Sequence, residues 1–481
     1  MRWIIWDGIL AGVMVVLTGG VYLTGFALMV GASQTAIGIL CSLPRLSQIM
    51  QPLGAFFVER LHMRKKISVG VFGPARLLWL LILLLPAMGY AGGKSRLALF
   101  VLISVAVVSS MLAGLASVSW FAWMADLIPE GGRGRFFSRR TMLAGGISAT
   151  IGFVAGKGLD LSKLWLGPDS AIGFLVVFGV GMVCGLASWY ALSRCPEPPI
   201  RPDPPGERPG FRAMLQDAWA DRNFRQLVYA LSFLTAGVWL AGPFFSVYMI
   251  REMELPYSLM SIFAACSSFG SLLMVRLWGR LSDHFGNRPV ILTCLFGTGF
   301  LVVPWLLTAN GAWWPLVIAH LVGGAAWSGV FLAQMNLVFK ITPDEHKSVY
   351  IGIFYALINL PPLLMPVVGG LFLESTAQWA WHVGTWTFTS YHALFAMSCV
   401  LRLCSIPIFH HVREPRAKRV VHMIRVLSHF RSLNPVLGLH YYAHVASDAA
   451  ANGTRLAAGA VRKTARRLRH RHNGDKVEGA D

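Results

Sequence analysis

Charged residues are scarce in this sequence. Asp, Glu, Lys and Arg together account for 13% of the 481 residues, whereas hydrophobic residues account for 55%. A water-soluble globule of this length needs more polar side chains to cover its surface. The composition therefore excludes a soluble globular protein and indicates that lipid surrounds most of the chain.

Acidic residues are fewer than basic ones. The sequence has 22 Asp and Glu residues against 42 Lys and Arg residues, which gives a formal net charge of +20. Such an excess can indicate nucleic-acid binding. The basic residues, however, lie between apolar runs and in the C-terminal segment, which is the distribution that the positive-inside rule produces in membrane proteins. We therefore expect no nucleic-acid partner.

Patterns typical of enzymes and metal sites are missing. There is no phosphate loop, no HExxH pair, no nucleophile elbow and no glycine-rich dinucleotide fingerprint between a strand and a helix. The seven cysteines lie mostly inside apolar runs and lack the spacing of metal ligands. We therefore expect no enzymatic activity, no cofactor and no bound metal ion.

Twelve apolar runs are long enough to cross a bilayer, which takes about 20 helical residues. They predict an all-α membrane protein with twelve transmembrane helices. The first run is longer than the core of a signal peptide, so we interpret it as a membrane span. The predicted spans are residues 1–30, 34–58, 67–89, 97–124, 141–158, 172–192, 227–250, 257–278, 289–308, 313–340, 349–373 and 391–410.

A proline-rich segment divides these spans into two sets of six. Seven prolines lie within residues 194–225 and keep that segment extended. We predict a six-helix bundle at 1–193, a cytoplasmic linker at 194–225, a second bundle at 226–411 and a basic cytoplasmic tail at 412–481. The basic residues concentrate in every second loop, so both termini are predicted to be cytoplasmic. We expect a monomer in the inner cell membrane.

The loop between the eighth and ninth spans carries the most specific motif. It runs Gly-Arg-Leu-Ser-Asp-His-Phe-Gly-Asn-Arg-Pro over residues 279–289. In Gly279, Asp283, Gly286 and Arg288 it resembles the signature loop of the major facilitator superfamily of secondary transporters, and most of the chain fits that architecture. The resemblance implies two pseudo-symmetric six-helix bundles that move a small molecule by alternating access, as a secondary active or facilitative transporter.

The resemblance also implies a gate at the cytoplasmic surface. A second, degraded copy of the motif lies at residues 55–66, where a Glu replaces the Asp, a base follows it and three bases end the loop, but Ala and His occupy the glycine positions. The segment from the end of the fourth span to the start of the fifth is expected to face these loops. The predicted gating residues are Gly279, Asp283, Gly286, Arg288, Glu59, Arg60, Arg64, Asp126 and Arg139. The alternative is a pair of ordinary charged turns.

Two arginines lie deep inside predicted spans, Arg45 in the second and Arg76 in the third. An arginine at the centre of a membrane helix costs about 2.5 to 3.5 kcal/mol on insertion scales, which indicates a role for both. Gln48 shares a helix face with Arg45. The alternative for Arg45 is pairing with backbone carbonyls or with Asp7. The predicted substrate-binding residues are Arg45, Gln48, Arg76, Tyr22, Trp239, Trp327 and Asn359, although any one aromatic can also be a packing residue.

No Asp or Glu lies near the middle of a predicted span, so proton coupling has no obvious carrier. We predict that the substrate is an organic anion or an amphipathic compound, with efflux as one possible direction. The alternative function is a transporter-shaped receptor or scaffold that no longer transports.

The C-terminal tail contains a helical stripe formed by Val420, Ile424, Leu427 and Phe430, with arginines off the stripe. This pattern favours a helix that lies on anionic membrane lipid. A solvated tail that serves only orientation is the alternative.

Overall fold

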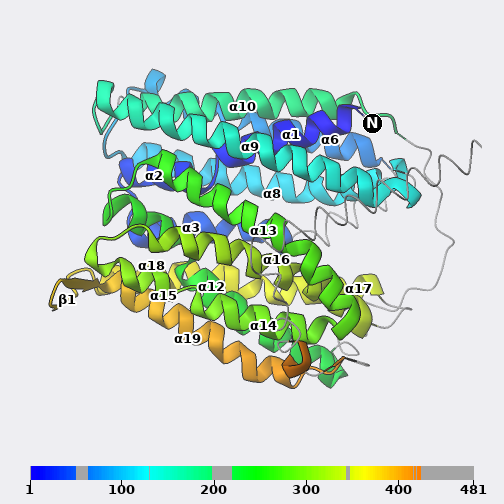
Figure 1. The fold of residues 1–481 in the computed structure, drawn as a ribbon. Helices are drawn as coiled ribbons and strands as arrows, with labels where there is room; N and C mark the ends of the chain where they lie inside the picture. The colour runs from blue at the N-terminus through cyan, green and yellow to red at the C-terminus, as the bar shows by residue number, and fades with distance from the viewer. Residues whose placement is uncertain are drawn as a thin grey trace, which may run out of the picture. The chain divides into compact units, whose positions relative to one another are not determined.

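The computed structural model describes residues 2–49, 63–90, 92–128, 130–197, 219–342, 347–414, 417–418 and 420–423. The chain separates into two compact units, Met1–Ala417 and Lys418–Asp481. The first unit is a bundle of long helices (Figure 1). The predicted lipid-bound helix of the tail lies outside the described residues except for the turn at 420–423.

The first half of the Met1–Ala417 unit begins with a broken helix. Gly20 has a φ of +51° between α1 and α2, a backbone angle that glycine adopts without strain. Pro44 opens the short 3₁₀ turn η1 in the next span. The elements are α1 (Arg2–Leu17), α2 (Gly20–Met29), α3 (Gln34–Ser42), η1 (Leu43–Arg45), α4 (Leu46–Ile49), α6 (Arg64–Leu77), α7 (Leu80–Leu83), η2 (Pro86–Met88), α8 (Arg96–Leu127), α9 (Glu130–Leu166) and α10 (Ile172–Ser193).

The second half repeats the pattern of long helices and adds one β-hairpin. The break between α17 and α18 falls at Asn359, just before two prolines that sit in the first turn of α18. The elements are α12 (Arg222–Arg251), α13 (Tyr257–Phe285), α14 (Asn287–Phe300), α15 (Val303–Leu306), η3 (Leu307–Asn310), α16 (Pro315–Ile341), α17 (Lys347–Ile358), α18 (Leu360–Ser375), β1 (Ala380–Val383), β2 (Trp386–Thr389) and α19 (Ser390–His410).

Eleven helical stretches among the described residues are long and apolar enough to cross a membrane. The predicted second span, 34–58, begins in α3 and continues through η1 and α4 to Ile49, where the described part of that segment ends. The predicted all-α membrane fold is confirmed. The predicted domain boundaries stay predictions, and most of the linker, residues 198–218, lies outside the described residues.

The two halves meet along two helix pairs. In the first half α1 packs on α9 and α10, and in the second α12 packs on α18 and α19. Between the halves α3 packs on α18, and α9 packs on α13. We call the end of the Met1–Ala417 unit that carries the β-hairpin the outer end. Figure 1 shows it opposite the N-terminus.

Candidate functional site

Arg45 and Trp239 meet between the two halves. The Cζ atom of Arg45 lies 3.9 Å from the centroid of the Trp239 ring. Arg45 is the last residue of η1 and Trp239 lies within α12, so each half supplies one partner. A guanidinium over an indole face is stabilised by about 0.5 to 2 kcal/mol, more where water is excluded. Two residues that the sequence predicted independently thus lie in one place.

Arg45 has no carboxylate as an ion-pair partner in the described part of the chain. Gln48 follows it in α4 and is half-buried. Asn359 donates from Nδ2 to the carbonyl oxygen of Tyr355 at 2.7 Å, and this contact covers the break between α17 and α18. Trp327 packs its ring against Phe331 within α16. The substrate-binding roles of these residues stay predictions.

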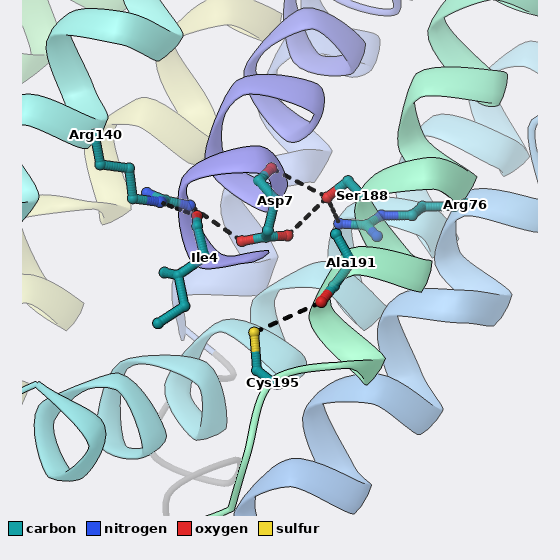
Figure 2. A network of polar contacts seen from close by, with 7 residues as sticks. All are labelled: Ile4, Asp7, Arg76, Arg140, Ser188, Ala191 and Cys195. Carbon is teal, nitrogen blue, oxygen red and sulfur yellow. Dashed lines mark hydrogen bonds and ion pairs between the residues drawn. The ribbon is translucent and has the colours of Figure 1, made fainter. Parts of the chain in front are cut away.

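Arg76 belongs to a polar network inside the first half. Its guanidinium donates to Ser188 Oγ at 3.0 Å, and that hydroxyl donates to Asp7 Oδ1 at 2.7 Å. Arg140 donates to the other carboxylate oxygen of Asp7 at 3.2 Å and to the carbonyl oxygen of Ile4 at 3.1 Å. Figure 2 shows the two guanidinium groups approaching Asp7 from opposite sides. The network therefore ties α1, α6, α9 and α10 together.

This network corrects one expectation about Asp7. The alternative interpretation from the sequence was that Arg45 pairs with Asp7. The carboxylate of Asp7 pairs with Arg140 instead. That choice was wrong because depth along a helix does not say on which side of the bundle a side chain lies. A further buried arginine, Arg402 in α19, was not predicted. It donates to the carbonyl oxygen of Thr298 at 3.2 Å.

Asp160 caps a helix of the opposite half. This residue lies near the end of α9, and its two carboxylate oxygens accept the backbone N–H groups of Tyr257 at 2.8 Å and Ser258 at 3.0 Å. These are the first residues of α13, which begins after Pro256 with no side-chain cap from that residue. A carboxylate there satisfies free N–H groups and interacts favourably with the positive end of the helix dipole.

Glu374 makes the equivalent contact on the other side. It lies near the end of α18 and accepts the backbone N–H of Thr35, at the start of α3, at 2.9 Å. The helices approach closely here, since a Cβ atom on Gly370 would lie 2.6 Å from the carbonyl oxygen of Gln34. Asp160 and Glu374, which we call the outer caps, join the halves at the outer end. Sequence reasoning missed both roles.

Tyr22 also contributes to the contact between the two halves. Its side chain is buried. The Tyr22 hydroxyl donates to the carbonyl oxygen of Gly152 and also lies 3.1 Å from Ser261 Oγ. Its ring stacks on that of Tyr257, with centroids 6.2 Å apart. Tyr22 is therefore held in a contact between α2, α9 and α13, and its substrate-binding role stays a prediction.

The signature loop is organised around Glu414, a residue that the sequence assigned to the tail. Its carboxylate accepts Asn287 Nδ2 at 2.8 Å, the backbone N–H of Arg288 at 2.7 Å and Lys340 Nζ at 3.0 Å. The Arg288 guanidinium donates to the carbonyl oxygen of His410 at 2.7 Å. Gly286 has a φ of +98°, and a Cβ atom there would lie 3.1 Å from the Glu414 carboxylate. The glycine therefore serves both the turn and this close approach.

The other predicted gating residues are dispersed or only partly described. Asp283 and Arg139 are exposed, on α13 and α9. Gly279 faces open space, and the carbonyl oxygen of Arg64 accepts from Ser119 Oγ at 2.7 Å. Glu59 and Arg60 lie outside the described residues, as does the side chain of Asp126. The gating roles stay predictions.

Glu414 predicts a pH-dependent stability. Burial opposes ionisation of its carboxyl, but the hydrogen bonds from Arg288, Lys340 and Asn287 outweigh burial and lower its pKa. A lowered pKa in the folded state means that the stabilisation is complete above the usual glutamate value, about 4.3, and is lost as the pH falls through the folded-state pKa. Thermal melting should therefore show a steeper acid-side loss of Tm in the wild type than in Glu414→Gln.

The control for this experiment is Glu254→Gln, which changes an exposed acid. This variant should keep the wild-type pH profile of Tm. Parallel profiles for wild type and Glu414→Gln would contradict the stabilising role of the ionised carboxylate.

A family model matches the second half of the sequence, and individual relatives match shorter stretches of the chain. The sequence model of the Major Facilitator Superfamily matches residues 227–451. An MFS-type transporter, patC of Penicillium expansum, is 26% identical over 114 residues, which are 24% of this chain and 20% of that protein. A Na⁺, Li⁺, K⁺/H⁺ antiporter of Planococcus maritimus is 20% identical over 162 residues, 32% of this chain and 37% of the antiporter. The matched stretch thus spans about a fifth of patC.

The fold matches solved structures over most of the chain. The nucleoside transporter NupG superposes with a TM-score of 0.60 and 14% identity, covering 85% of this chain and 100% of NupG. The inward-open xylose transporter XylE from E. coli gives a TM-score of 0.61 and 14% identity, covering 88% and 98% of the two chains. The second half of this multi-pass membrane protein thus matches the Major Facilitator Superfamily in sequence, and the chain as a whole shares the fold of these solved transporters.

Proposed function

We propose that the protein is a transporter that moves a small organic anion with an apolar or aromatic part across the cell membrane by alternating access. The observation that carries this proposal is the contact of Arg45 with Trp239 between the halves. This contact combines the positive charge of Arg45 with the aromatic ring of Trp239. The anionic part of an amphipathic compound would contact Arg45, and its apolar part would contact Trp239.

The charge of Arg45 supports an anionic substrate. An arginine in a membrane span is costly unless it is paired, and none of the described carboxylates pairs with this one. Its planar guanidinium can hold a carboxylate or phosphate through two parallel hydrogen bonds. A bound anion would therefore offset the cost of the buried charge, and the half-buried amide of Gln48 adds a donor and an acceptor nearby.

The outer caps support alternating access. They join the halves through hydrogen bonds between carboxylates and helix ends, so a rocking motion can break them without unfolding a helix. Export is the direction that we propose, because a relative in Aspergillus clavatus, 25% identical over 114 residues, is named an efflux pump. We also propose cytoplasmic termini and a tail on anionic lipid, from the distribution of basic residues. That the protein is a monomer stays a separate proposal.

Substitutions of Arg45 test the proposal. A screen of organic anions for thermal stabilisation of the purified protein identifies ligands, and flux in proteoliposomes then measures their transport. Arg45→Gln should lower flux of the anionic ligands about tenfold or more, which corresponds to one lost charged hydrogen bond. Arg45→Lys should retain weak binding with altered selectivity, because it keeps the charge and loses the planar donors.

The control is Arg96→Gln, which changes an exposed arginine at the start of α8. It should leave both binding and flux unchanged. A well-folded Arg45→Gln protein that transports every identified ligand at the wild-type rate would contradict the proposed site, and the absence of any flux in wild-type protein would contradict transport itself.

A further inference from the structure

The segment between α18 and α19 forms a defined β-hairpin. Residues 376–389 run Thr-Ala-Gln-Trp-Ala-Trp-His-Val-Gly-Thr-Trp-Thr-Phe-Thr, and β1 pairs antiparallel with β2. Gly384 has a φ of +60°, whereas Thr385 does not have a positive φ. A positive φ at the first central residue alone is typical of the two-residue type II′ hairpin turn. This turn sets the register of the two strands.

The register gives the hairpin two unlike faces. Trp381 is paired with Phe388, and Val383 with Trp386. Side chains alternate along a strand, and paired residues share a face, so these four apolar side chains lie on one side. The rings of Trp386 and Phe388 stack with an interplanar angle of 11°. On the other side His382 Nδ1 lies 3.2 Å from Thr387 Oγ1.

Much of the apolar face is uncovered. The side chains of Trp381 and Val383 are 73% and 49% exposed, and the preceding Trp379 is 65% exposed. Residues 376–389 contain no Asp, Glu, Lys or Arg. Contiguous exposed apolar surface without charged residues marks a contact with protein or membrane, so this uncovered aromatic face indicates an apolar environment.

The hairpin stands where the membrane-spanning surface ends. The apolar spans Tyr350–Ser375 and Ser390–His410 flank it directly. Its base is fixed, because β2 packs on η3 and the Phe388 ring lies 5.6 Å from that of His392. The exposed Trp313 and Trp314 follow η3 at the same end. Figure 1 shows the hairpin projecting beside α15, α18 and α19.

We propose that this hairpin is a membrane-interface anchor, with the exposed Trp381 and Val383 inserted among the headgroups and upper acyl chains of the outer leaflet and the half-buried Trp386 and Phe388 supporting them from the second strand. Tryptophans concentrate at that depth because their rings are apolar and their N–H groups are polar. An apolar face opposite a polar one is the arrangement that lies in an interface. A docking face for a soluble protein would be surrounded by charged groups, and this segment has none. The inference does not depend on transport.

Spin labels on the two faces test the anchor. A genetically encoded nitroxide amino acid is placed at Val383 or, as the matched control, at the neighbouring His382, and each protein is reconstituted in nanodiscs of phosphatidylcholine and phosphatidylglycerol. Collisions with oxygen, which concentrates in lipid, and with a water-soluble nickel chelate are then measured. The oxygen-to-nickel collision ratio should be about tenfold higher at 383 than at 382.

Two results would overturn the proposal. Equal ratios at both positions would mean that the apolar face stands in water. Low collision with both reagents at 383 would mean that protein covers the face, from this chain or from a second copy. A third comparison uses Trp381→Ser in the 383-labelled protein. This change should raise nickel collision at 383, because the apolar face loses its most exposed tryptophan, and an unchanged nickel collision would contradict insertion by that face.

Discussion

Replacement of both outer caps, Asp160→Asn with Glu374→Gln, should open the outer end of the protein. Each carboxylate accepts backbone N–H groups of a helix in the opposite half, and charge-assisted bonds of this kind contribute about 2 kcal/mol when partly buried. Glu374 is exposed, so its share is smaller, about 1 kcal/mol. Loss of about 3 kcal/mol shifts a two-state equilibrium about a hundredfold away from the closed outer end.

The opening can be measured behind the caps. Ser261 is buried between α9 and α13, where its hydroxyl lies 3.1 Å from that of Tyr22. The experiment uses detergent-solubilised protein that carries Ser261→Cys, so that a charged maleimide can reach both ends. The maleimide should modify the new thiol much faster in the double-cap variant than in the protein with Ser261→Cys alone. Each single-cap variant should be intermediate, and Asp160→Asn should have the larger effect.

The control for the caps is Glu254→Gln, an exposed acid in the loop before α13. It should leave the labelling rate at position 261 unchanged. If the folded double-cap variant reacts no faster than its parent, the two carboxylates do not hold the halves together. Flux should fall in the double-cap variant under the proposed function, because a carrier that rests in one state completes fewer cycles.

The membrane spans were predictable because lipid imposes a length and an apolar composition on every crossing helix. The ends of the helices were less predictable. The fifth span was expected at 141–158, but α9 extends from Glu130 to Leu166, since a helix can continue into water beyond the apolar run. The ninth span was expected at 289–308. There α14 ends at Phe300 and the short α15 begins with Pro304 in its first turn.

The contacts that organise the helix ends could not be predicted from local patterns. Asp160 is separated by 97 residues from Tyr257, and Glu374 by 339 residues from Thr35. Each acid binds backbone N–H groups, which every residue type except proline supplies, so the partner leaves no signature in the sequence. Glu414 was missed for the same reason. Its backbone partner is the N–H of Arg288, which leaves no signature in the sequence. Only Gly286, in the turn before Arg288, was recognised from the sequence.

The β-hairpin did leave a signal. Apolar and polar residues alternate through Trp381, His382 and Val383, and a Gly-Thr pair separates them from a second alternating run. The segment lies between the predicted spans 349–373 and 391–410, and the prediction of membrane spans did not cover it. Arg45 was singled out for the opposite reason, since a charge in a long apolar run is conspicuous, and its substrate-binding role stays a prediction.

Substitution of Asp7 should produce the largest loss of folded protein. Asp7 is 3% exposed, and its carboxylate lies between Arg140 and the Ser188 hydroxyl that also binds Arg76. Removal of one partner from a buried charge pair costs about 3 to 5 kcal/mol, because the remaining charge is left without compensation. Asp7→Asn should therefore lower the melting temperature and the yield of monodisperse protein far more than substitution of an exposed acid such as Glu254.

A double-mutant cycle identifies the partner of Asp7. Arg140→Gln removes the guanidinium that lies 3.2 Å from Asp7, so Asp7→Asn with Arg140→Gln should recover part of the loss, and the two changes should be clearly non-additive. Arg45→Gln provides the matched control, because Arg45 contacts Trp239 in the second half. Its combination with Asp7→Asn should be additive to within about 0.5 kcal/mol. Coupling of Asp7 to Arg45, and none to Arg140, would reverse the assignment. The guanidinium at Arg45 would then be a structural partner, and it would no longer support an anion site between the halves.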